Sequence, residues 1–134
     1  MKIEDVEGIG PAFAQKLSAA GVATTDALLE RGGTSTGRDK LSEATGISER
    51  LILEWVNHAD LMRIDGVGSE YADLLEAAGV DSAAELAQRS AANLATTFQE
   101  LDAARPNTVR QVPSEATIAG WIAQAARMDK VVSH

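Results

Sequence analysis

Two short glycine motifs are the residues of this chain whose types and spacing suit ligand binding. Residues 6–10 read Val-Glu-Gly-Ile-Gly, and residues 64–68 read Ile-Asp-Gly-Val-Gly. In each motif, two glycines flank one apolar residue directly before an expected helix. A turn of this kind bares backbone N–H groups at the N-terminus of a helix, which makes a ready site for an anion. Each motif is therefore a candidate anion-binding hairpin.

The two motifs are part of a repeat that runs through the chain. Gly8 and Gly66 lie 66 − 8 = 58 positions apart, and the same offset pairs Phe13 with Tyr71, Ala14 with Ala72, Leu17 with Leu75, Gly21 with Gly79, Val22 with Val80 and Leu28 with Leu86. A later block repeats at an offset of 66 and pairs Ser48 with Ser114, Ile52 with Ile118, Trp55 with Trp121 and Ala59 with Ala125. The second copy thus holds 66 − 58 = 8 extra residues, which must fall between Leu86 and Pro113, with the stretch 105–110 as the natural place. A fixed period of this length indicates a duplicated structural unit.

Apolar spacing and capping residues predict helices along the whole chain. We expect them over residues 2–7, 11–20, 25–32, 38–45, 48–59 (running on or bending into 61–64), 69–78, 82–89, 91–104 and 114–128. The predicted fold class is all-α, a single domain of residues 1–134. Repeat one spans 1–62 and repeat two spans 63–128, packed with pseudo-twofold symmetry around one core, and 129–134 form a loose tail.

Composition and charge limit the functions open to this chain. It has 134 residues, 45% of them apolar, no cysteine and a formal net charge of −8. Without cysteine there is no disulfide, thiolate metal site or thiol nucleophile. No apolar run approaches the length that crosses a membrane, and no leader segment opens the sequence, so we expect a cytoplasmic protein with no membrane partner. The negative charge is spread over both halves, which disfavours nucleic acid because its affinity rests on Lys and Arg.

The glycine motifs resemble the helix-hairpin-helix superfamily in a tandem arrangement. The residues that carry this likeness are the two glycines, the alanine and the leucine of each copy: Gly8, Gly10, Ala14 and Leu17, then Gly66, Gly68, Ala72 and Leu75. The wider pattern is similar to the family of bacterial proteins called domain of unknown function 4332. That likeness rests on residues 41–48, 55–64, 113–115 and 121–124 and covers almost the whole chain. It implies the paired-hairpin fold and no particular activity.

The superfamily resemblance implies a set of phosphate-binding residues. In its DNA-binding members, hairpin backbone N–H groups hold a phosphate, often with a monovalent cation on the hairpin carbonyls. Carried over, the site residues are Gly8, Ile9, Gly10, Gly66, Val67 and Gly68, with Lys16 as the nearest downstream cation. Carboxylates surround both hairpins, at Glu4, Asp5 and Glu7 in the first and at Asp65, Glu70 and Asp73 in the second. Each carboxylate near a phosphate would oppose binding by roughly 1 kcal/mol.

Three further groups of residues have both a functional and a structural interpretation. Trp55 and Trp121 are either platforms for stacked bases or matched core residues, and we expect core. Arg38, Lys40 and Arg50 form either a small basic patch or, as we expect, a solvated helix face. His58 and Asp60 are expected to be an exposed polar pair, and Tyr71 a core residue whose hydroxyl reaches outward.

The function expected from these observations is a non-enzymatic interaction module. No nucleophile–histidine–acid set, phosphate-binding loop or metal-ligand cluster is visible, so we expect no catalytic residue, metal or cofactor. We expect a protein partner or self-association. The alternative is sequence-independent binding of a DNA or RNA backbone through the two hairpins. A weaker alternative is a phosphate-bearing small ligand between the two halves.

Overall fold

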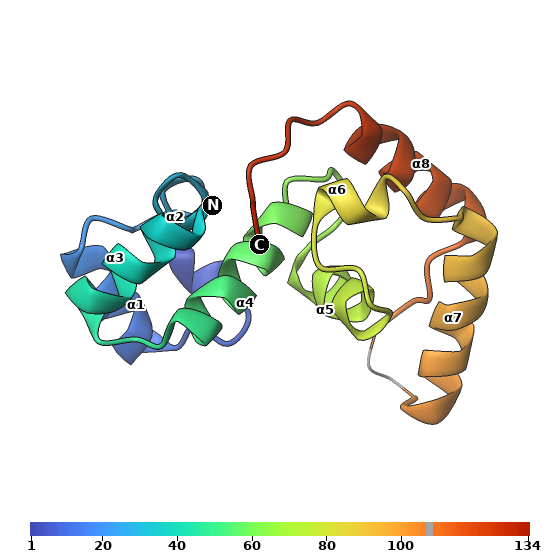
Figure 1. The fold of residues 1–134 in the computed structure, drawn as a ribbon. Helices are drawn as coiled ribbons and strands as arrows, with labels where there is room; N and C mark the ends of the chain where they lie inside the picture. The colour runs from blue at the N-terminus through green and yellow to red at the C-terminus, as the bar shows by residue number, and fades with distance from the viewer. Residues whose placement is uncertain (107–108) are drawn as a thin grey trace. The chain divides into compact units, whose positions relative to one another are not determined.

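The computed structural model describes residues 1–106 and 109–134, and this part of the chain is all-helical (Figure 1). Its elements are η1 (Ile3–Asp5), α1 (Pro11–Ala19), α2 (Thr25–Gly32), α3 (Ser35–Thr45), α4 (Glu49–Leu61), α5 (Ser69–Ala77), α6 (Ala83–Leu86), α7 (Ala91–Ala104) and α8 (Glu115–Ala126). Only one isolated bridge, between Lys2 and Thr24, is strand-like among the described residues. The all-α prediction is confirmed.

Hydroxyl side chains set where most of these helices begin. Each cap accepts a hydrogen bond from the backbone N–H three residues on, which satisfies a donor that has no partner inside the helix. The caps are Thr24 for α2, Thr34 for α3, Ser82 for α6, Ser90 for α7 and Ser114 for α8. The N-caps of α1 and α5 are glycines, Gly10 and Gly68, and neither has a side-chain cap. These two helix starts are the ones that follow the glycine motifs.

Four predicted helix boundaries were wrong by two or three residues. The first element is the short 3-10 helix η1, which ends at Asp5 rather than at 7. Helix α3 begins at Ser35 rather than at 38, because Thr34 caps it. Helix α6 ends at Leu86 rather than at 89, since Ser90 already caps the next helix. Helix α8 ends at Ala126 rather than at 128.

The chain divides into two compact units, each of which is described by itself. Unit 1 is Met1–Asp60 with Lys130–His134, and unit 2 is Leu61–Asp129. This division lies within two residues of the boundary predicted between the repeats. Each unit has a hydrophobic cluster of its own. The predicted single core with pseudo-twofold packing therefore stays a prediction, while each repeat already buries an apolar face within itself.

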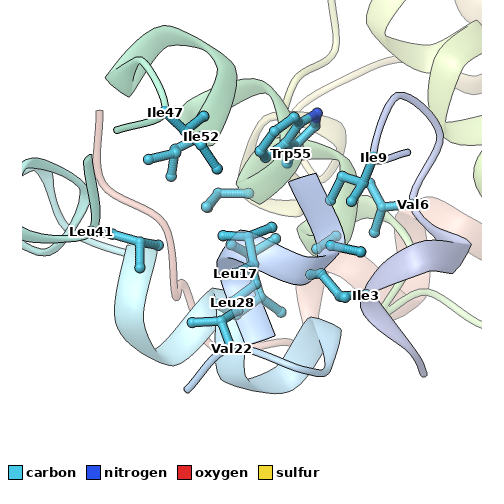
Figure 2. Close-up of a cluster of buried hydrophobic side chains, with 14 of the residues drawn as sticks. Ile3, Val6, Ile9, Leu17, Val22, Leu28, Leu41, Ile47, Ile52 and Trp55 are labelled. Atoms are coloured by element: carbon cyan, nitrogen blue, oxygen red, sulfur yellow. The ribbon is translucent and has the colours of Figure 1, made fainter. Parts of the chain in front are cut away.

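The core of unit 1 draws on η1 and on helices α1 to α4 (Figure 2). Its fully buried members include Ile3, Leu17, Val22, Leu28 and Ile52, which contribute side chains from five successive segments. Burying each such side chain contributes about 1.5–3 kcal/mol. The core of unit 2 is built from the equivalent positions, namely Leu61, Leu75, Val80, Leu86 and Ile118, and adds Phe98 from α7.

Residues 129–134 are not the loose tail that the sequence predicted. Val132 is only 2% exposed and belongs to the core of unit 1. The backbone N–H of Ser133 donates to the carbonyl of Gly33 at 2.9 Å. The prediction failed because the partners of this segment lie about a hundred positions away in the sequence, where no local pattern reveals them.

Candidate functional site

The first hairpin, residues 6–10, is a tight turn between η1 and α1. Gly8 has φ +92°, which an L-residue rarely adopts, so a glycine is required there. The N–H of Ile9 donates to the carbonyl of Val6 at 3.1 Å, and this bond closes the turn. Ile9 is 5% exposed and anchors the turn in the core of unit 1, whereas both glycines are exposed. Gly10 has ordinary extended angles and begins α1.

The second hairpin, residues 64–68, has the same geometry inside unit 2. Gly66 has φ +94°, and the N–H of Val67 donates to the carbonyl of Ile64 at 3.0 Å. Val67 is 4% exposed, and Gly68 begins α5 with extended angles. The two hairpins therefore present the same pattern of backbone groups, one on each unit.

A tryptophan lies against each hairpin glycine, a contact that the sequence analysis did not foresee. A Cβ built on Gly8 would lie 3.4 Å from Nε1 of Trp55, and one built on Gly66 would lie 3.2 Å from Nε1 of Trp121. Each indole is 3% exposed and packs on the aromatic residue that follows its hairpin. The ring centroids are 5.1 Å apart for Phe13 and Trp55, and 5.3 Å apart for Tyr71 and Trp121. The signal available in the sequence was the pairing of both tryptophans and both ring residues in the repeat.

Several N–H groups at these hairpins donate no hydrogen bond within the described part of the chain. They belong to the backbone of Gly8 and Gly10 in unit 1, to Gly66 and Gly68 in unit 2, and to the indoles of Trp55 and Trp121. Each hairpin therefore offers donors that suit an oxygen-bearing group, such as a carbonyl, a carboxylate or a phosphate.

These features of the two hairpins are accompanied by a family match. A model of the family described as domain of unknown function (DUF4332) matches residues 7–128. The chain belongs to this family. No curated protein and no solved structure matches the sequence.

The second hairpin of this DUF4332 chain is held by a side-chain clamp. The amide of Gln124 accepts a hydrogen bond from the N–H of Asp65 at 3.0 Å and donates to the carbonyl of the same residue at 3.2 Å. Both backbone groups of Asp65 are therefore occupied. At the offset of 66, Gln124 corresponds to His58 in the first repeat. The two repeats therefore carry different side chains at this position.

Carboxylates rather than cations surround both hairpins. Glu4, Asp5 and Glu7 are exposed beside the first, and Asp65 and Glu70 are exposed beside the second. Glu70 also accepts a hydrogen bond from the backbone N–H of Arg110 at 2.6 Å. Lys16, the one candidate cation, is exposed on the last turn of α1. The field at either hairpin is therefore negative, which opposes a polyanion.

Arginine side chains that a nucleic-acid surface would need are directed at backbone carbonyls instead. Four of them donate to such carbonyls: Arg31 to Ala20 at 3.0 Å, Arg38 to Gly32 at 2.9 Å, Arg63 to Asp129 at 3.0 Å and Arg89 to Gly79 at 3.0 Å. Arg31 and Arg89 are equivalent in the repeat, and each closes the C-terminal end of the first helix after its hairpin. The guanidinium groups of Arg31, Arg38 and Arg89 thus cap helix ends, where the helix dipole favours a cation, whereas Arg63 binds a carbonyl beyond the end of α8.

Two polar predictions were wrong. Arg38 is not part of a solvated face, because it is 5% exposed and its guanidinium lies among three backbone carbonyls. Burial lowers the pKa of Arg38, and the charge of Glu49 acts in the opposite direction. His58 and Asp60 are not an exposed pair, since they are 3% and 2% exposed. For Arg38, a position that a helical wheel assigns to solvent is covered by Ser133, 95 positions away in the sequence.

Other predictions for the site residues agree with the structure. Trp55 and Trp121 are core residues, so neither offers a ring face for base stacking. The hydroxyl of Tyr71 does reach out of the core, and it donates to the carbonyl of Gln111 at 2.8 Å. Lys40 and Arg50 are exposed, and Arg50 pairs loosely with Glu54 at 3.9 Å.

Unit 2 also contains a cleft of about 480 Å³ between α5 and the end of α7. Its apolar lining includes Leu74, Leu101 and Val109, and its charged lining is Asp73, Asp102 and Arg105. Two carboxylates against one guanidinium make a poor site for a phosphate-bearing ligand.

Within the described ranges, no helix is both long and apolar enough to span a membrane.

Proposed function

We propose that this chain is a tandem helix-hairpin-helix module without enzymatic activity, and that it binds a protein partner or a second copy of itself. The matched turns support the helix-hairpin-helix assignment, with a glycine near φ +90° and an anchored apolar residue in both. The proposal includes pseudo-twofold pairing of the two repeats, drawn from the duplication in the sequence. It also includes a cytoplasmic location without cofactor, drawn from composition.

The single observation that carries the choice of partner is the charge around the hairpins. Each hairpin offers unpaired N–H donors, so it suits an oxygen acceptor. The same hairpins are flanked by exposed carboxylates, and at least four arginines already cap carbonyls. A single carbonyl or carboxylate of a protein partner satisfies the donors at modest electrostatic cost. A phosphate backbone would bring many negative charges toward a chain of net charge −8.

The experiment that tests this function measures DNA binding and self-association of the same preparation. Labelled duplex and single-stranded DNA are titrated with the chain at low salt, and fluorescence anisotropy is recorded. We expect no binding at micromolar protein. Sedimentation equilibrium over a wide range of protein concentrations then reports whether the chain associates with itself. Tight, salt-sensitive DNA binding would refute the proposed partner class and leave the fold assignment intact.

Sequence-independent binding of a DNA or RNA backbone is the second candidate, and the unpaired hairpin donors favour it. It predicts that Gly10→Val and Gly68→Val abolish binding, because their side chains would cover the exposed N–H groups. It also predicts that Lys16→Glu weakens binding and reduces the salt slope by about 1. Lys40→Glu is the matched control, since it changes the net charge equally on a different helix, α3. Equal effects of Lys16→Glu and Lys40→Glu would exclude a local contact at the first hairpin.

A further inference from the structure

The segment 130–134 lies against unit 1 at a site that we call the cleft, formed by Gly33 at the end of α2, Arg38 on α3 and Asn57 on α4. Its main chain makes two hydrogen bonds with this cleft. The N–H of Ser133 donates to the carbonyl of Gly33 at 2.9 Å, and the carbonyl of Ser133 accepts from Nη2 of Arg38 at 2.7 Å. Val132 inserts into the hydrophobic cluster and is 2% exposed. The segment therefore occupies the cleft as an extended peptide occupies a receptor.

The cleft is shaped for close approach of a peptide backbone. A Cβ on Gly33 would lie 2.4 Å from the carbonyl oxygen of Val131 and 2.7 Å from that of Leu29, so any larger residue would displace the segment or strain the end of α2. Arg38 is held in place by the carbonyls of Gly32 and Gly33, which its Nη1 reaches at 2.9 and 3.2 Å. Its Nη2 is thereby directed at the peptide. A fixed guanidinium loses less entropy when it binds than a mobile one does.

A third polar contact fixes the register of the bound segment. Nε2 of His134 lies at a hydrogen-bonding distance of 2.8 Å from Oδ1 of Asn57, on α4. Together with the bonds at Ser133, this contact means that one apolar side chain, the backbone N–H and carbonyl of the next residue and one imidazole are recognised in sequence. The chemistry that the cleft accepts is therefore an extended apolar-Ser-His segment.

We propose that this cleft is a self-association site, in which the segment 130–134 of one copy binds the cleft of a second copy. Every contact described above is made by residues that a second copy also carries, so the exchange forms no new contact and loses none. The segment follows directly on unit 2, where Arg63 holds the carbonyl of Asp129 at 3.0 Å. Binding within one chain is favoured at low concentration by the high effective concentration of a tethered segment. Exchange between chains is therefore expected to grow with protein concentration.

This inference deepens the proposed function, because it names a second copy as the partner and a defined cleft as the surface. It does not depend on the hairpins. Self-association through hairpins or helix faces would produce dimers without contact between segment and cleft. An experiment can therefore refute the exchange of the segment without refuting self-association, and the reverse.

Cysteine crosslinking of full-length chains tests the exchange, since the chain has no cysteine of its own. Chains carrying Asn57→Cys are mixed with chains carrying His134→Cys at high concentration, and the mixture is oxidised. We expect a disulfide-linked heterodimer at a level about tenfold above that of a control pair, Glu100→Cys with His134→Cys. Glu100 is exposed on α7 and lies outside the cleft. Gly33→Ala added to the Asn57→Cys chain should remove the excess.

A double variant, Asn57→Cys with His134→Cys in one chain, calibrates the result. It should close an internal disulfide at low protein concentration, which shows that the two positions are competent to react. If this internal disulfide closes but the mixed chains give no more heterodimer than the control pair does, the proposed exchange between copies is wrong. Failure of the double variant to close would overturn the bound segment itself.

Discussion

Replacing one hairpin glycine at a time should show which glycine is needed to form the turn and which one only keeps the backbone N–H groups accessible to a ligand. Gly8 and Gly10 are two positions apart, both exposed, and both belong to the candidate site. Their backbones differ, since Gly8 has φ +92° while Gly10 has φ −81° and ψ 179°. A Cβ on Gly8 would meet Nε1 of Trp55 at 3.4 Å, whereas a Cβ on Gly10 meets no atom within 4 Å. Alanine is therefore strained at the first position only.

The expected magnitudes follow from these angles and contacts. An L-residue held at positive φ costs about 1–3 kcal/mol. Replacing glycine also restricts the unfolded chain, which returns about 0.4–1 kcal/mol. The net loss for Gly8→Ala is therefore about 1–2 kcal/mol in the free energy of unfolding. Gly10→Ala has no strain, and its entropic gain is offset by alanine being a poor N-cap, so its change is within about 0.5 kcal/mol.

Thermal unfolding followed by circular dichroism measures this difference. Gly8→Ala should lower the melting temperature by about 4–8 °C, and Gly10→Ala should leave it nearly unchanged. The pair Gly66→Ala and Gly68→Ala repeats the comparison in unit 2, where the indole of Trp121 is closer, at 3.2 Å. A larger loss at Gly10 than at Gly8 would refute the argument from backbone angles. If Gly10 tolerates a side chain as expected, Gly10→Val can be used to test ligand binding without straining the turn.

Three further predictions concern packing and the bound segment, each measured as the free energy of unfolding in urea. Gly33→Ala should destabilise the chain, because its Cβ would lie 2.4 Å from the carbonyl oxygen of Val131 and 2.7 Å from that of Leu29. Gly120→Ala is the control, since its Cβ would meet no atom within 4 Å, and it should be neutral or stabilise the chain by up to about 1 kcal/mol. Phe98→Ala should cost about 3–5 kcal/mol, since the ring is fully buried in unit 2, and a loss below about 1 kcal/mol would contradict that packing. Tyr71→Phe should cost about 0.5–1.5 kcal/mol by removing the bond to Gln111, and an unchanged stability would show that this bond contributes nothing.

The duplication, the helices and most of the core could be predicted from the sequence. Caps such as Thr24 and Ser82, and C-terminal glycines such as Gly21, act on backbone groups within a few residues, so their positions can be read locally. The repeat also helped, because each position of one copy could be compared with its equivalent in the other. Leu17 and Leu75 were paired by the repeat, and both are fully buried.

The candidate site could be predicted only in part. The hairpins, and the need for glycine at Gly8 and Gly66, follow from the motif. The indole N–H of Trp55 beside Gly8 does not, because the two residues lie 55 − 8 = 47 positions apart and meet only when α4 packs on the hairpin. The clamp that Gln124 places on Asp65 was missed for the same reason, at 59 positions apart.

The sequence by itself determined an all-helical, duplicated, acidic chain with a glycine hairpin in each copy, because spacing, caps and charge act through near neighbours or by simple addition. Only the tertiary structure decided the environments of Arg38, of His58 and of the segment 130–134. Arg38 donates a hydrogen bond to the carbonyl of Ser133, 95 positions away, and no repeat or apolar spacing in the sequence predicts this contact. Such contacts depend on which surfaces remain open after the helices have packed, and that is a property of the assembled unit.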